Sequence, residues 1–189
     1  MAATSPRLTG DERFSTGDTV RDFWAYAMSN LQGNAARGYL AEFLVAQAVG
    51  AAGTRIEWDA FDVETPDGRT IEVKTSGYTQ TWQPRGPAVI VFSGLPGKAG
   101  KRSWYASTGS MGDAHVADVY VFAVQTTQRG EPYDGLDIDE WRFHVLPGRV
   151  VAETAQASMR LSTVVKLGGV PVRWDDLAVA IDEACSPRR

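Results

Sequence analysis

The chain has 189 residues and a formal net charge of −4, and 43% of its residues are hydrophobic, as in ordinary globular domains. Six Trp, six Tyr and seven Phe exclude a disordered chain, and one cysteine excludes a disulfide scaffold. The two histidines, His115 and His144, have no partner cysteines at zinc-ligand spacing. The sequence shows no signal peptide and no apolar run long enough to span a membrane. We therefore expect a cytoplasmic protein that does not bind membranes.

Two helices are predicted in the first fifty residues. Residues 1–17 are polar and are expected to form a flexible arm, and residues 18–189 a single domain. Thr19-Val-Arg-Asp22 resembles a capping box, and apolar residues then recur at helical spacing as far as Leu31. A second helix is predicted over residues 35–49, with Gly50 ending it. This helix is apolar almost all round, so we expect it to be buried on most sides.

After residue 50 the apolar period changes from 3.6 to 2, which indicates strands. Short helices are expected at the C-terminal end, over residues 162–167 and 175–184. The fold class predicted by this order is α/β, with a central mixed sheet of about five strands flanked by helices. The predicted strands are residues 55–64, 69–75, 88–92, 119–124 and 141–146, of which 119–124 is continuously apolar and is expected to be central.

The first two strands form a hairpin whose turn fixes the register. Pro66-Asp67-Gly68 suits a three-residue loop, which places Asp62 opposite Glu72, on the same face as Lys74. Facing carboxylates repel each other and destabilise a strand pair. A bound divalent cation would reverse the sign of that interaction, because carboxylate oxygens are preferred ligands of Mg²⁺.

Glu42 supplies a third carboxylate near the predicted site. Its neighbours three and four residues away on the second helix are uncharged, so it lies either at the edge of a cleft or in a buried position that requires compensation. A metal ion or a lysine would supply that compensation. The alternative is a glutamate that reaches solvent past a small neighbour.

A helix glutamate, an aspartate and a Glu-x-Lys on a hairpin together resemble the PD-(D/E)XK nuclease superfamily. The resemblance covers residues 35–95 and rests on Arg37-Gly-Tyr-Leu-Ala-Glu42, Asp59-Ala-Phe-Asp62 and Ile71-Glu-Val-Lys-Thr-Ser76. Tyr78-Thr-Gln80 is similar to the glutamine that this family often carries after the lysine. No proline precedes Asp62, which departs from the family pattern. Asp59 is an alternative to Asp62, but it falls on the apolar face in the predicted register.

The resemblance implies a restriction-endonuclease-like fold and Mg²⁺-dependent hydrolysis of phosphodiester bonds, with Mn²⁺ able to substitute. Asp62, Glu72 and Glu42 would hold the metal. Lys74 would orient the attacking water or stabilise the charge of the transition state. Gln80 would hold the water or a phosphate, although a polar surface residue after a strand would give the same pattern.

A basic segment follows the hairpin. From Val73 to Gly112 there are five cations and no acidic residue, although the chain as a whole is acidic. This distribution suits a phosphate ligand approached from one side, although a surface loop made soluble by Lys and Arg would look the same. Apart from Lys74, the residues predicted to bind nucleic acid are Lys98, Lys101, Arg102, Arg85 and Tyr78.

We therefore predict a DNA endonuclease of the restriction, defence or mobile-element type. Its expected partner is double-stranded DNA, together with a second copy of the chain or a recognition protein. Two alternatives stay open. One is a nuclease of the same fold that acts on RNA or branched DNA, and the other is a non-catalytic module that binds nucleic acid and uses the carboxylates structurally.

Overall fold

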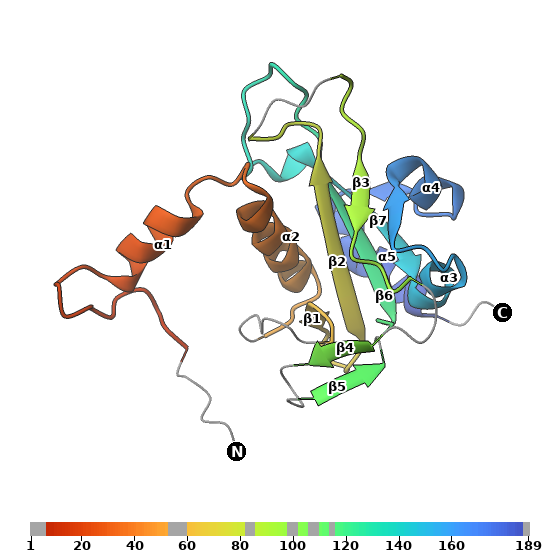
Figure 1. The fold of residues 1–189 in the computed structure, drawn as a ribbon, viewed down its shortest axis with the longest axis horizontal. Helices are drawn as coiled ribbons and strands as arrows, with labels where there is room; N and C mark the ends of the chain where they lie inside the picture. The colour runs from red at the N-terminus through yellow and green to blue at the C-terminus, as the bar shows by residue number, and fades with distance from the viewer. Residues whose placement is uncertain are drawn as a thin grey trace.

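The computed structural model describes residues 7–52, 60–81, 86–97, 102–105, 110–113 and 116–186. Within these residues, no helix has the length and apolar character needed to cross a bilayer. In the described parts of the chain, five α-helices, a 3₁₀ turn and nine strands follow one another, and Figure 1 shows their arrangement. The elements are α1 (Val20–Met28), α2 (Asn34–Ala48), β1 (Val63–Glu64), β2 (Thr70–Gly77), β3 (Val91–Ser93), β4 (Arg102–Tyr105), β5 (Ser110–Asp113), β6 (Val119–Gln125), η1 (Ile138–Glu140), β7 (Trp141–Pro147), α3 (Gly148–Glu153), β8 (Ser158–Arg160), α4 (Leu161–Lys166), β9 (Pro171–Val172) and α5 (Trp174–Cys185).

The central sheet has five strands in the order β1-β2-β6-β7-β9. Strands β2 and β6 are parallel, and the other neighbours are antiparallel. The sheet is therefore mixed and flanked by helices, as the sequence predicts. Every residue of β6 is buried, because it is the middle strand and both of its faces are covered. This explains its continuous apolar run.

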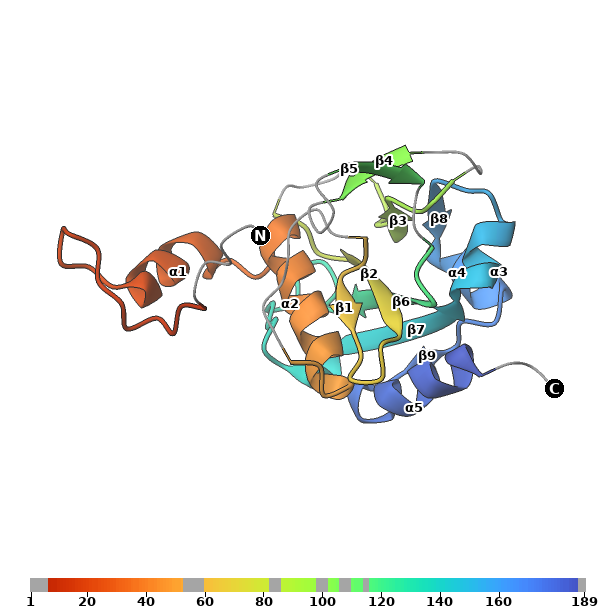
Figure 2. The same cartoon turned by 90° about the horizontal axis from the view of Figure 1, so that it is seen from below.

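Different elements cover the two faces of the sheet (Figure 2), and an apolar cluster lies on each face. On one face, α2 and α5 pack through Ala41, Val45, Leu177 and Ile181 against strand residues that include Ile71. On the other face lie β3, β8, α3 and α4, whose packing residues are Phe92, Leu95, Met159, Val151 and Val164. A short two-stranded sheet, β4–β5, lies beyond β1.

The strand predictions need two corrections. The segment predicted as a third sheet strand, residues 88–92, becomes β3, which pairs with β8 and not with the central sheet. The fifth strand of the central sheet is instead β9, which pairs with β7. Both β3 and β9 are very short, so the periodicity of the sequence carries little information about their pairing. Of the predicted strand 55–64, residues 55–59 lie outside the described part.

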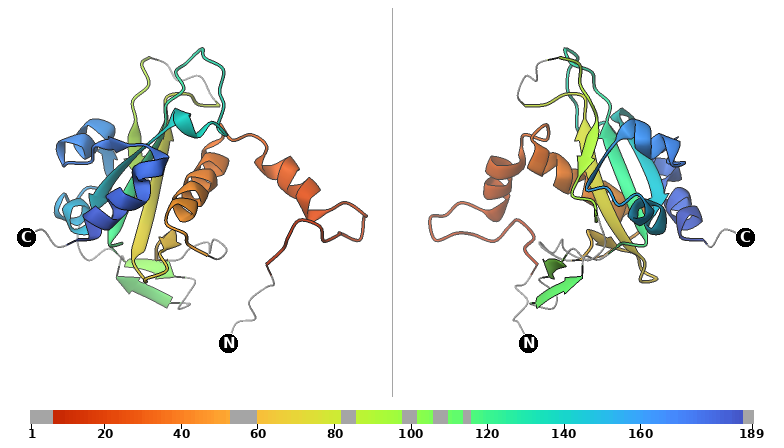
Figure 3. Two further views of the ribbon diagram at one scale, coloured as in Figure 1. Left: turned by 180° about the vertical axis from the view of Figure 1, so that it is seen from behind. Right: turned by 45° about the vertical axis from the view of Figure 1, so that its right-hand side comes forward.

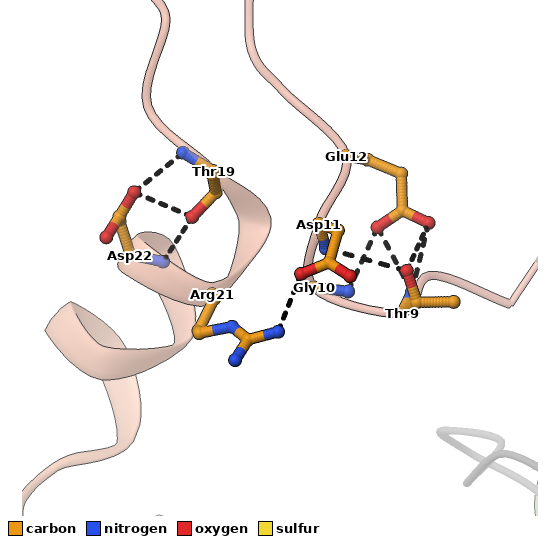
Figure 4. Close-up of polar contacts among 7 residues, drawn as sticks. All are labelled: Thr9, Gly10, Asp11, Glu12, Thr19, Arg21 and Asp22. Atoms are coloured by element: carbon orange, nitrogen blue, oxygen red, sulfur yellow. Dashed lines mark hydrogen bonds and ion pairs between the residues drawn. The ribbon is translucent and has the colours of Figure 1, made fainter.

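The predicted capping box is present at the start of α1 (Figure 4). The Thr19 hydroxyl accepts from the Asp22 amide at 3.2 Å, and the Asp22 carboxylate accepts from the Thr19 amide at 2.8 Å. In the preceding loop, the Glu12 carboxylate accepts hydrogen bonds from Thr9 and Gly10. Bonds from its own amide and that of Thr9 lower the pKa of Glu12 to about 2.

Helix α1 ends at Met28, short of the predicted Leu31, and lies away from the sheet (Figure 3). Val20 is buried, but the larger apolar side chains are not: Phe23 is 52% exposed and Tyr26 is 91% exposed. The predicted division into an arm of residues 1–17 and a domain of residues 18–189 stays a prediction. Helical spacing shows that an apolar face exists but cannot show what covers it.

Helix α2 is buried or half-buried at most of its positions, as the sequence predicts, and a narrow strip of it is exposed. Arg37, Ala41 and Val45 are buried, whereas Phe43 is 57% exposed. The helix flanks one edge of the sheet, so its outer side meets solvent (Figure 2). Gly50 has φ +64°, the left-handed conformation expected of a glycine that ends a helix.

Candidate active site on the first hairpin

The hairpin register is as the turn chemistry predicts. Val63 pairs with Ile71 and Glu64 with Thr70, and Gly68 has φ +87°. The Thr65 amide donates to the Arg69 carbonyl at 2.9 Å, which closes the loop. Alternate residues of β2 consequently face opposite sides of the sheet, so Glu72 and Lys74 lie on the face opposite to α2.

Asp62 sits beside this pair in a way that the sequence did not predict. Its amide donates to the Ile71 carbonyl at 3.1 Å, although the register pairs Ile71 with Val63. Two residues of one strand thus meet one residue of the other, which is the pattern of a β-bulge. The expected one-to-one pairing of Asp62 with Glu72 is therefore replaced by a local bend.

The bend gives the Asp62 carboxylate a backbone partner. Its Oδ2 accepts from the Val73 amide at 2.8 Å, a donor beyond the start of β1 that would otherwise lack a strand partner. This bond holds the carboxylate at the sheet edge, next to the two residues that flank Val73. Asp62 therefore reaches Glu72 and Lys74 from the side.

Glu72 and Lys74 form an ion pair in a half-buried position. Their side chains keep only 19% and 18% of their accessible surface. Burial raises the pKa of Glu72, and the charge of Asp62 raises it further, whereas Lys74 opposes both effects. The negative charges of Asp62 and Glu72 thus repel each other, and the positive charge of Lys74 offsets this repulsion.

Glu42 is half-buried on α2. Among the described residues, no three His, Cys, Asp or Glu side chains form a group that could hold a metal ion. Glu42 as a third metal ligand stays a prediction, and the two carboxylates whose charges interact are those of Asp62 and Glu72. Helix α2 packs on the sheet face that carries Ile71 and Val73, opposite to the side chains of Glu72 and Lys74. Asp59, the alternative to Asp62, lies outside the described residues.

Gln80 is engaged with a buried arginine. Its Oε1 accepts from Nη2 of Arg37 at 3.2 Å, and its Nε2 donates to the Gly77 carbonyl at 3.0 Å. Arg37 also donates to the Thr79 carbonyl at 3.2 Å and to Asn34 Oδ1 at 2.6 Å. Gln80 thus joins α2 to the end of β2, and both its side-chain oxygen and its side-chain nitrogen form hydrogen bonds with protein atoms.

Sequence reasoning missed the role of Arg37. It is only 2% exposed, burial lowers its pKa, and its Nε lacks a partner within the described residues. A signal was present, because Arg37 is four residues before Ala41 and eight before Val45 and so shares their buried stripe. The N–H groups of a buried arginine require hydrogen-bond acceptors. The residues after β2 supply two of them, the Thr79 carbonyl and Gln80 Oε1.

The predicted nucleic-acid contacts fall mostly outside the description. Arg85, Lys98 and Lys101 lie outside the described residues, and Arg102 is in β4 with its side chain outside the description. Tyr78 is half-buried and packs against the cluster that contains Phe92. The structure thus places Tyr78 next to the face that carries Lys74.

The sequence matches the family model described as Bacteriophage T4 endonuclease IV over residues 20–133. The match covers more than half of the chain. The chain belongs to this endonuclease family. No curated protein is significantly similar to the chain. The matched region of this family member runs from α1 through the whole of β6, and it includes Asp62, Glu72, Lys74 and Gln80. Its membership makes it a nuclease, with nucleic acid as its substrate class.

Proposed function

We propose that this family member is a metal-dependent DNA endonuclease of the PD-(D/E)XK type, with Asp62, Glu72 and Lys74 as its catalytic residues. The observation that carries the proposal is the half-buried Glu72–Lys74 pair with the Asp62 carboxylate held beside it. The family match supports endonuclease chemistry independently of that geometry. The phage origin of the protein for which the family is described suits a role in defence or in a mobile element.

The residues at the site suit a divalent cation. Two carboxylates lie close enough for the charge of Asp62 to raise the pKa of Glu72, and Mg²⁺ is commonly held by one or two carboxylates together with substrate phosphates. Asp62 and Glu72 would hold Mg²⁺ or Mn²⁺. When bound, such an ion acidifies a water molecule and neutralises charge on the scissile phosphate.

Each side chain has a part in that chemistry. Asp62 is positioned by its bond from the Val73 amide, which leaves Oδ1 without a hydrogen bond among the described residues. Lys74 would exchange its bond to Glu72 for a non-bridging oxygen of the phosphate, or would orient the attacking water. A cation aimed at the place where charge develops typically contributes a factor of about 10²–10³ to the rate.

Gln80 is proposed as a positioning residue and not as a ligand of water or phosphate. Its side-chain amide joins Arg37 to the Gly77 carbonyl. It therefore fixes the end of β2, three residues beyond Lys74. The role of Glu42, on α2, as a third acidic ligand of the metal stays a prediction.

The test is cleavage by wild type, Lys74→Ala and Lys166→Ala. Lys166 is an exposed lysine at the end of α4 and serves as the matched control. The substrates are supercoiled plasmid, linear duplex, single-stranded DNA, branched DNA and RNA, each with Mg²⁺, Mn²⁺ or EDTA. We expect metal-dependent cutting of DNA that Lys74→Ala reduces at least about a hundredfold and that Lys166→Ala leaves unchanged.

Other outcomes would change the proposal. Cutting by Lys74→Ala at the wild-type rate would remove Lys74 from the mechanism. A preference for RNA or branched DNA would keep the site and change the substrate. No cutting of any substrate, together with no Mg²⁺ binding by calorimetry, would favour a non-catalytic nucleic-acid-binding module.

Cutting both strands of a duplex would require two such sites, so we also propose that the active form includes a second copy of the chain or a recognition partner. Sedimentation of the protein with and without duplex DNA tests this. A monomer that makes double-strand breaks in a single encounter would contradict it.

A further inference from the structure

Gly94, directly after β3, lies against the ammonium group of Lys74. A Cβ built at Gly94 would stand 3.5 Å from Lys74 Nζ and 3.8 Å from Lys74 Cε. These two residues are twenty positions apart: Lys74 is in β2 of the central sheet, and Gly94 follows a strand that belongs to a different sheet. Gly94 is solvent-exposed, so the exposed surface next to the ammonium at this point is bare backbone.

The neighbours of Gly94 hold it firmly in place. Phe92 and Leu95, on either side of it, are each only 1% exposed. Ser93 pairs with Ser158 in β8, and the Leu95 amide donates to the Ala157 carbonyl at 3.1 Å. The position of Gly94 beside Lys74 is therefore set by a paired strand and two buried side chains.

The same packing holds the lysine strand. Lys74 is in register with Phe122 of β6, and the ring of Phe122 packs edge-to-face against Phe92 with centroids 5.0 Å apart. The contact between Phe92 and Phe122 thus holds both the segment that carries Gly94 and the strand that lies beside Lys74. An arrangement supported on both sides in this way is what a preorganised catalytic group requires.

We infer that Gly94 is a positioning residue for Lys74, whose missing side chain keeps open the side of the ammonium across which a phosphodiester oxygen approaches. This inference rests on the proposed function. Gly94 has φ +77°, so the backbone also favours glycine here. A methyl group at 3.5 Å is in ordinary contact and does not clash, but it occupies the space that an oxygen bound to Lys74 would need. The basic run Lys98-Ala-Gly-Lys-Arg102 follows four residues later in the sequence.

The chain contains a matched control in Gly97. It has φ +73°, almost the same as Gly94, and among the described residues its added Cβ would meet only the Ala157 Cβ, at 3.8 Å. Gly94→Ala and Gly97→Ala should therefore impose a similar backbone penalty and similar decreases in melting temperature. They differ in what the new methyl group contacts.

The first readout is steady-state cleavage of the preferred DNA substrate. We expect Gly94→Ala to lower kcat about tenfold to a hundredfold with little change in KM, because the fault lies at the reacting phosphate. Gly97→Ala should retain kcat within about threefold. Equal losses in both variants would show that loop strain alone is responsible and would overturn the inference.

The second readout does not require activity. Acetylation of the folded protein, followed by mass spectrometry, measures the labelling of Lys74 relative to exposed Lys166. We expect Gly94→Ala to reduce this ratio severalfold and Gly97→Ala to leave it unchanged. An unchanged ratio in Gly94→Ala would overturn the inference even in an active enzyme. If the wild type cuts nothing, the proposed function fails, while the labelling still tests the contact.

Gly94→Asn and Gly97→Asn provide a second pair in case alanine destabilises the loop. Asparagine adopts the left-handed conformation more readily than alanine does, and its side chain fills the same space. The same contrast in kcat and labelling is expected between the two positions. If both Asn variants behave alike, Gly94 has no special role.

Discussion

The two faces of strand β2 carry different duties, although their residues alternate along the same eight positions. On one face, Ile71 and Val73 are buried beneath α2 and belong to the main apolar cluster. On the other face, Glu72 and Lys74 are half-buried and charged. The first face contributes stability by removing apolar surface from water. The second carries a carboxylate whose charge is disfavoured in the folded protein. Apolar core residues and charged residues thus alternate along β2, one residue apart.

Substitutions on the two faces should separate the two duties. Ile71 is fully buried, so Ile71→Ala should lower the free energy of unfolding by about 2–5 kcal/mol through lost burial and a cavity. Urea denaturation measures this loss. Lys74→Ala should lower the urea midpoint much less than Ile71→Ala does while reducing cleavage at least about a hundredfold. A large loss of stability in Lys74→Ala would show that the charged face also supports the fold.

The pH dependence of stability should come partly from Glu72. Its pKa is raised in the folded protein above the ordinary 4.5, so the folded state binds this proton more tightly than the unfolded state does. The contribution of Glu72 to stability is therefore greatest below pH 4.5 and falls as the pH rises through the raised pKa. In EDTA, Glu72→Gln should flatten this slope of melting temperature against pH. The exposed Glu64 on the same hairpin provides the control Glu64→Gln, which should leave the slope unchanged.

The smallest expected effect is at Asp62, where charge and hydrogen bonding can be separated. In metal-free buffer, Asp62→Asn removes the repulsion from Glu72 but keeps an oxygen for the Val73 amide. It should raise stability by about 0.2–1 kcal/mol. Asp62→Ala also removes the acceptor, so it should lower stability by about 1–3 kcal/mol. Thermal melts of the two variants distinguish these effects. A lower melting temperature for Asp62→Asn would contradict the repulsion.

Local chemistry made the hairpin and the first cap predictable from the sequence. A proline, an aspartate and a glycine in the turn determine the register of β1 on β2, and Thr19 with Asp22 determines where α1 begins. These interactions join residues only a few positions apart, so the chain needs no distant partner to form them. The continuous apolar run of β6 likewise announced a strand covered on both faces.

The surroundings of the site depended on contacts between distant segments. The bend at Asp62, the bond from Arg37 to Gln80 and the approach of Gly94 to Lys74 each involve residues separated by between 11 and 43 positions. Gly94 reaches Lys74 only because β3 pairs with β8, a strand more than sixty residues later. Sequence patterns report the period of each segment but not its partner. The tertiary structure therefore decided what surrounds the Glu72–Lys74 pair, because only packing brings these distant segments together.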